Sequence, residues 1–167
     1  MGEIIKKQDH RREFIDTLIE LAEKDETITL NIPDVGFLYV DEFSKRFPDR
    51  FFNNGCTELF TIADAVGQSL EGAKPYCYSM INFVLFRPYE AVRNCVVHHK
   101  ANVKLLGVKG SSSYKFLGFS HNMTHEYEDI EACKALNLKS YLPTNNEEVK
   151  KAVLDSYGDE TACYIRL

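Results

Sequence analysis

The segment FPDRFFNNGCTELFTIADAVGQSLEGAKPY, residues 47–76, places a short apolar run, a turn and a helix in immediate succession. The turn falls at residues 53–55, where two asparagines precede a glycine. Gly72 ends the helix, and the segment PYCYSMINF, residues 75–83, carries the next strand into a further helix. The helix itself is predicted from apolar residues that recur at steps of three and four, at Leu59, Ile62, Ala63, Val66 and Leu70.

The same alternation extends to both ends of the chain. Further helices are expected at residues 9–24, about 87–98, 126–136 and 146–157, and further strands at residues 27–32, 103–108, 140–142 and 163–167. Glycine and serine dominate a loop at residues 110–120. Strands that alternate with helices of this length imply right-handed crossovers and a mainly parallel sheet covered on both faces. We therefore predict an α/β fold of three layers, α/β/α, with a doubly wound sheet and one domain over residues 1–167.

Composition excludes several functional classes. The 20 basic and 25 acidic residues are interspersed, and a net charge of −5 offers no positive surface for nucleic acid. No apolar stretch approaches the roughly 20 residues that span a membrane, and the first residues lack the apolar centre of a secretion signal. The 5 cysteines form no CxxC pair, and no HExxH occurs, so no metal site is predicted. We expect a soluble, cytoplasmic protein with reduced cysteines.

Functional residues of such a fold gather in loops beyond the carboxyl ends of its strands. The candidate loops are residues 33–37, 53–58, 78–86 and 109–125. They contain neither GxGxxG nor GxxxxGK[ST], the common phosphate-binding signatures. His98 and His99 are adjacent, so on a helix they cannot both face one ligand, and we interpret them as a helix end.

Six segments, in order, resemble the pyrimidine-binding domain of transketolases and deoxyxylulose-phosphate synthases, over residues 14–167. The most specific combination is FPDRFFN followed by a glycine, two residues and a glutamate, which here is Glu58. The resemblance implies the thiamine diphosphate-binding fold and thiamine diphosphate as the cofactor. The six segments are residues 47–76, YSMINFVLFRPYEAVRN (78–94), VKLLGVKG (103–110), LGFSH (117–121), YEDIEACKALNLKSYLP (127–143) and ACYIRL (162–167).

Glu58 is the catalytic residue that the resemblance implies. In this family the glutamate hydrogen-bonds a nitrogen of the cofactor's aminopyrimidine ring and so promotes removal of the thiazolium proton. This chemistry needs a carboxyl group that shares a proton in a site sheltered from water. The alternative is an exposed acidic residue that merely complements the dipole of its helix.

Four more residues match cofactor-binding positions of the family. Phe83 and Phe86 match aromatic residues that pack against the pyrimidine ring, and Met80 stands where another aromatic residue is usual. The alternative for Phe83 and Phe86 is a purely structural role in the core. Asp34 matches an acidic residue that borders the cofactor at the subunit boundary, and its alternative is a turn role near Gly36.

The substrate-binding region departs from the family pattern. Transketolases carry an acidic residue and a histidine before a GPTH motif, whereas here the stretch reads GSSSYKFL, residues 110–117. GFSH, residues 118–121, resembles the motif itself. It makes His121 the favoured sugar-binding candidate, because a glycine lies three residues before it and a hydroxyl one residue before. His125, in NMTH, is the second candidate.

The family's magnesium- and diphosphate-binding motif, GDG with a later asparagine pair, is missing from this sequence. The resemblance therefore implies a separate diphosphate-binding subunit that holds Mg²⁺, with two of each chain in a heterotetramer. Because the chain stops at Leu167, where the last strand should finish, we also expect the third domain of full-length transketolases to be absent.

These observations predict the small subunit of a split transketolase, which transfers a two-carbon ketol unit between sugars or sugar phosphates. The alternatives are a beta-type subunit of a 2-oxo acid decarboxylating enzyme, a deoxyxylulose-phosphate synthase, and a non-catalytic scaffold subunit. RPYEAVRN (87–94) and YIRL (164–167) favour transketolase. Glu58 argues against a scaffold, and the altered stretch at residues 110–117 argues for one.

Overall fold

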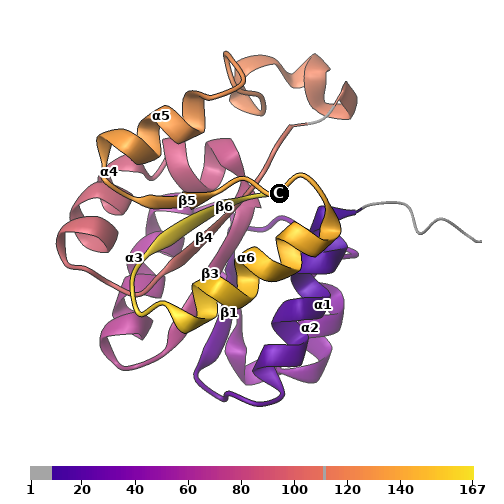
Figure 1. Ribbon diagram of the computed structural model, residues 1–167, viewed down its shortest axis with the longest axis vertical. Coiled ribbons are helices and arrows are strands. Elements are labelled where there is room, and N and C mark those ends of the chain that lie inside the picture. Colours follow the sequence, from indigo (N-terminus) through magenta and orange to yellow (C-terminus); the bar gives the residue numbers. More distant parts are fainter. Residues whose placement is uncertain (1–8, 111) are drawn as a thin grey trace, which may run out of the picture.

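The computed structural model describes residues 9–110 and 112–167. Six strands form one sheet in the order β2-β1-β3-β4-β6-β5, and every pairing is parallel (Figure 1). The predicted α/β fold is therefore confirmed. The strands are β1 (Ile28–Ile32), β2 (Phe51–Asn53), β3 (Lys74–Met80), β4 (Lys104–Val108), β5 (Lys139–Tyr141) and β6 (Cys163–Arg166).

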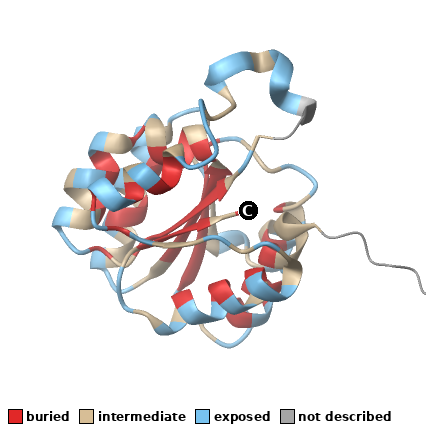
Figure 2. Cartoon of the chain, turned by 45° about the horizontal axis from the view of Figure 1, so that its top comes forward, coloured by how far each residue is buried: buried red, intermediate tan, exposed pale blue. Residues whose placement is uncertain are grey.

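Helices cover both faces of the sheet, and the buried residues lie between the layers (Figure 2). One core contains residues of α1, α2 and α6, and the other contains residues of α3, η2, α4, η3 and α5. Neighbouring strand residues point to opposite cores, as with Tyr76 and Cys77. The helical elements are α1 (His10–Ala22), α2 (Asp41–Arg46), η1 (Pro48–Arg50), α3 (Glu58–Leu70), η2 (Asn82–Phe86), α4 (Tyr89–Ala91), η3 (Val92–His98), η4 (Ser112–Ser120), α5 (Glu128–Ala135) and α6 (Asn146–Gly158).

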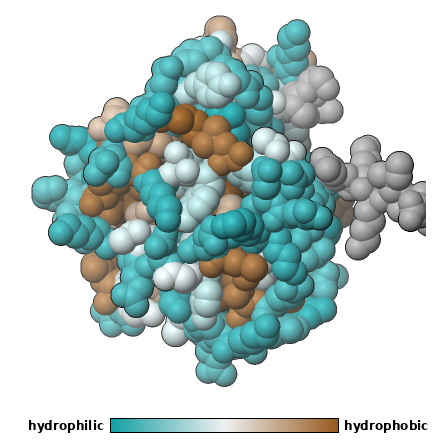
Figure 3. Space-filling view, in the orientation of Figure 1, coloured by the Kyte–Doolittle hydropathy of each residue, from teal (hydrophilic) through white to brown (hydrophobic). Residues whose placement is uncertain are grey.

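The outer surface is mostly hydrophilic, and apolar residues gather in separate patches on the face drawn in Figure 3. Within the described ranges, no helix combines the length and the apolar content needed to cross a membrane.

Several elements differ from the sequence prediction. Strand β3 ends at Met80, and helical turns begin at Asn82 instead of about Arg87. The short helix α2 was not predicted, because Phe43 is its single buried residue and leaves no periodic pattern. Residues 112–120, predicted as a loop, form 3₁₀ turns that break at Gly118, where φ is +62°.

Asp25 connects three elements at the amino-terminal edge of the sheet. Its carboxylate accepts hydrogen bonds from Lys74 Nζ at 2.8 Å, Tyr157 Oη at 3.0 Å and the Thr27 amide at 2.9 Å. Burial raises the pKa of Asp25, but these hydrogen bonds outweigh burial and hold the pKa well below its usual range. The carboxylate thus ties the start of β1 to β3 and α6.

We predict that Asp25→Asn lowers the free energy of unfolding by about 2 kcal/mol at pH 7, the scale of hydrogen bonds to a charged group. Because the folded pKa is depressed, the stabilisation is present above the unfolded pKa of about 3.9 and is lost as the pH falls below it. Urea unfolding at pH 7 and pH 3 should therefore show a smaller difference between variant and wild type at pH 3. An equal difference at both pH values would contradict this account. Asp155→Asn, which loses an ion pair within one turn of α6, is the control.

Candidate functional site

The candidate site lies at the carboxyl ends of β1, β3 and β4. The chain leaves β1 toward α2 and leaves β3 toward η2, and these two segments pack into opposite cores. A hollow of about 370 Å³ opens between the diverging segments. Its lining includes Arg11, Asp34, Gly36, Tyr39, Tyr78, Ser79, Met80, Phe83, Tyr114 and His121.

Glu58 is the first residue of α3 and follows a turn in which Gly55 has a φ of +68°. Only 14% of its side chain is exposed, and Oε1 accepts a hydrogen bond from Arg87 Nη1 at 2.5 Å. The carboxylate lies along a narrow crevice that it shares with Ser79 and Phe83. The crevice is too narrow to admit a water molecule.

Phe83 joins this crevice to the larger hollow, because its ring lines both. The ring is 8% exposed and meets the His121 imidazole edge to face, with 4.9 Å between centroids. On another side, the guanidinium carbon of Arg87 lies 4.1 Å from the ring centroid. Phe83 therefore offers an aromatic surface within reach of a carboxylate and an imidazole.

Asp34 takes part in the turn after β1. It has a φ of +56° in the turn after β1, and it exchanges two hydrogen bonds with Asn53, each of 3.0 Å. It also lines the hollow. Two residues later, Gly36 has a φ of +87°, and a Cβ there would stand 2.5 Å from the Tyr78 ring. The turn thus requires glycine so that the chain can pass over Tyr78.

The remaining predicted residues divide into two groups. Met80 and His121 line the hollow, and His121 Nδ1 lies 2.7 Å from Ser120 Oγ. Phe86 lines neither cavity and packs against the core on the α3 side. His125 is exposed, and its Nε2 lies 3.5 Å from a Glu131 oxygen.

Sequence reasoning did not single out Ser79, which lines both cavities, or Arg87, which lines neither but contacts Glu58 and Phe83. Arg87 lies 29 residues from Glu58 in the chain, and no local pattern indicates that they pair. Ser79 could have been found from the alternation of β3, since it faces the same side as Cys77 at the carboxyl end of the strand.

The Ser79 hydroxyl is the clearest sign that this site takes a ligand. The residue is 1% exposed and lines both the hollow and the crevice. Within the described part of the chain, its Oγ has no hydrogen-bond partner. A buried polar group without a partner is costly, so a ligand that meets this hydroxyl gains affinity. Beside it, burial raises the pKa of the Tyr78 phenol, which is therefore neutral at pH 7. A flat, polar aromatic ring suits such surroundings.

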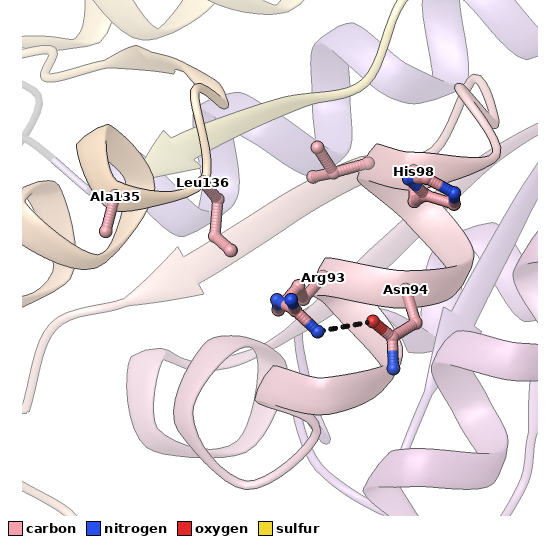
Figure 4. A pocket seen from close by; sticks show the side chains of 6 residues that line it. Arg93, Asn94, His98, Ala135 and Leu136 are labelled. Atoms are coloured by element: carbon pink, nitrogen blue, oxygen red, sulfur yellow. Dashed lines mark hydrogen bonds between the residues drawn. The ribbon is translucent and has the colours of Figure 1, made fainter.

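A second hollow, of about 400 Å³, lies between η3 and α5 (Figure 4). There Arg93 donates a hydrogen bond to the neighbouring Asn94 at 2.9 Å, and His98, as predicted, lies in the last turn of its helix. None of the predicted site residues lines this hollow. Among residues 9–110 and 112–167, no cluster of three or more histidine, cysteine or acidic side chains could hold a metal ion.

Residues 6–167 match the family model described as "Transketolase, pyrimidine binding domain". The chain belongs to this family. The transketolase relatives belong to a family of transferases, and membership of this family implies dependence on thiamine diphosphate. The aromatic surface, the shielded carboxylate and the unpaired hydroxyl fit the aminopyrimidine ring of that cofactor.

Individual relatives agree with this assignment. A subunit of the apulose-4-phosphate transketolase of Phocaeicola vulgatus is 29% identical over 144 residues, covering 86% of this chain and 46% of that protein. A putative transketolase C-terminal section of Methanocaldococcus jannaschii is 31% identical over 159 residues, covering 94% and 49%. A solved structure described as "Split gene transketolase, inactive beta4 tetramer" superposes with a TM-score of 0.81 at 27% identity, covering 95% of this chain and 50% of that one. The chain thus spans about half the length of these relatives.

We predict that Ser79→Ala raises the free energy of unfolding of this transketolase-family chain by about 1 kcal/mol, because it removes an unpaired buried hydroxyl. Ser156→Ala is the matched control, since the Ser156 hydroxyl is also buried but donates to the Val153 carbonyl at 2.7 Å. That variant should lose stability. Urea denaturation of both variants tests the difference. If Ser79→Ala loses as much stability as Ser156→Ala, the Ser79 hydroxyl is paired within the chain.

Proposed function

We propose that this chain is the aminopyrimidine-binding subunit of a split transketolase, which transfers a two-carbon ketol unit between sugars or sugar phosphates. The observation that carries the proposal is the position of the Glu58 carboxylate, shielded from water beside the Phe83 ring and the unpaired Ser79 hydroxyl. When bound, thiamine diphosphate supplies the carbon nucleophile for this transfer.

In the proposed role, Glu58 holds a proton against a nitrogen of the aminopyrimidine ring. Its exposure of 14% favours this work, because few water molecules compete for the carboxyl oxygens. Phe83 and Met80 provide the apolar contact that orients the ring, and Ser79 provides a further hydrogen bond at the ring's edge. Phe86 does not contact the cofactor ring in this proposal; it packs against the core that holds η2, and with it Phe83, in place.

The imidazole of His121 is the proposed contact to the sugar. It lines the hollow, while the Phe83 ring and the Ser120 hydroxyl fix its orientation. His125 contributes less, because its ring turns toward the exposed Glu131. Asp34 borders the same hollow and supplies a carboxylate at its rim. The departure from the family at residues 110–117 lies beside this subsite, so we assign only the substrate class.

A partner subunit completes the proposed enzyme by holding Mg²⁺ and the diphosphate. A strongly charged diphosphate needs a cation and several polar ligands, and the described residues hold no cluster suited to a metal ion. Large apolar side chains are exposed on the segments that surround the site, as expected for a surface that another chain covers. These are Phe37, Leu38, Leu59, Phe60, Phe116 and Phe119.

The relatives support the same arrangement. The protein of Phocaeicola vulgatus is one subunit of its transketolase, and that of Methanocaldococcus jannaschii is a C-terminal section, so both names describe parts of a divided enzyme. The matched solved structure is an inactive assembly of beta chains, which supports the view that this half needs its counterpart. We propose two copies of each chain in the active enzyme.

The test is Glu58→Gln in the reconstituted two-subunit enzyme. The substitution keeps the shape and one hydrogen bond but removes the shared proton, so ketol transfer should fall by about 10²- to 10⁴-fold with little change in folding. Glu147→Gln is the matched control, because Glu147 is an exposed acidic residue in the first turn of α6. If Glu58 only complements its helix dipole, both variants will keep full turnover, and the proposal fails.

A further inference from the structure

Arg87 makes two contacts at once with residues of the candidate site. Its Nη1 donates to Glu58 Oε1 at 2.5 Å, and its guanidinium carbon lies 4.1 Å from the centroid of the Phe83 ring. A guanidinium is flat and delocalised, and its N–H donors lie in its own plane. It therefore reproduces, on this carboxylate and this ring, the stacking and the hydrogen bond that a flat heteroaromatic ligand would make.

The two side chains of this ion pair differ in their exposure to water. The Glu58 side chain is 14% exposed and projects from the first turn of α3, whereas half of the Arg87 side chain is exposed. Arg87 directly follows η2, and Pro88 comes next, so its long side chain reaches the site from the rim. Arg87 is thus the member that can turn out into water, where a guanidinium is well solvated.

We propose that Arg87 is an internal gate, which occupies the aminopyrimidine place while no cofactor is bound and swings outward when the ring enters. The inference rests on the proposed function, since it takes Glu58 and Phe83 as the ring's contacts. The closed gate gives the shielded carboxylate a charged partner. Only molecules with an open gate can bind the ring. The apparent affinity is therefore the intrinsic affinity multiplied by the fraction of molecules in which the gate is open.

The experiment uses the whole chain and the hydroxymethyl aminopyrimidine fragment of thiamine, which lacks the diphosphate and needs no partner subunit. Calorimetric or NMR titration should show Arg87→Ala binding this fragment about tenfold more tightly than wild type, the scale of one partly exposed ion pair plus one cation–π contact. Arg93→Ala is the matched control, because Arg93 lies in η3 and, among the contacts described, bonds only its neighbour Asn94. It should bind like wild type.

Salt provides a second readout that a merely structural arginine would not give. The fragment is neutral near pH 7.5, so screening acts on the ion pair and not on the ligand. Raising the salt from about 0.05 M to about 0.5 M should tighten binding to wild type and leave Arg87→Ala unchanged. Arg87→Lys, which keeps the charge but loses the planar fork, should fall between the two.

Unchanged or weaker binding by a folded Arg87→Ala chain would overturn the gate. The proposed function fails separately, in the double variant Glu58→Gln/Arg87→Ala. If Glu58 holds the ring, the double variant binds more weakly than Arg87→Ala alone. If both bind equally well, the fragment does not use Glu58, and the proposed role of this carboxylate is wrong.

Discussion

The constraint on which the rest of this structure depends is that the chain turns to opposite faces of the sheet after β1 and after β3. These strands are parallel neighbours, yet the chain leaves β1 for one face of the sheet and leaves β3 for the other. Packed side chains cannot fill the space where the two segments part, so a hollow forms at the carboxyl edge. The loop from β2 brings Glu58 to the same edge at the start of α3. The place of the hollow follows from this one topological feature.

The Glu58 carboxylate then restricts which ligands can bind at this edge of the sheet. A carboxylate that is mostly removed from water needs a partner, because an uncompensated buried charge is strongly destabilising. In this chain Arg87 is that partner. In the proposed enzyme a nitrogen of the aminopyrimidine ring takes its place, with the same carboxylate and the same aromatic ring. Arg87 and the ring nitrogen thus compete for the same carboxylate. A stronger ion pair stabilises the empty site and lowers its affinity for the ring.

Much of the fold could be predicted from the sequence, since α1, α3 and α6 carry long amphipathic patterns and the buried strands β1 and β4 are rich in branched residues. Helix α2 and the 3₁₀ turns of η4 could not, because each buries too few side chains to leave a period. Wide turns in η2 begin directly after β3, and the apolar residues of both elements form one continuous run that hides the boundary.

The candidate site was predicted only in part, and for a physical reason. The resemblance to the family led to Glu58 and Phe83, which do lie side by side along one crevice. Their contact with Arg87 depends on how the strands are ordered, and that order places residues far apart in sequence next to each other. Phe86 faces the core because the wide turn of η2 rotates it away from Phe83, a geometry that an ordinary helical period does not reveal.

In the proposed enzyme, an aminopyrimidine ring binds between Glu58, Phe83 and Met80. The chain has 3 methionines, and within the described residues Met80 lines the hollow while Met123 packs against the core on the α3 side. NMR of the chain labelled with carbon-13 at its methionine methyl groups, titrated with the aminopyrimidine fragment of thiamine, tests the claim directly. We expect ring currents to shift the Met80 methyl signal while the Met123 signal stays in place. A Met80 signal that does not move up to the solubility limit of the fragment, or a shift confined to Met123, would contradict it.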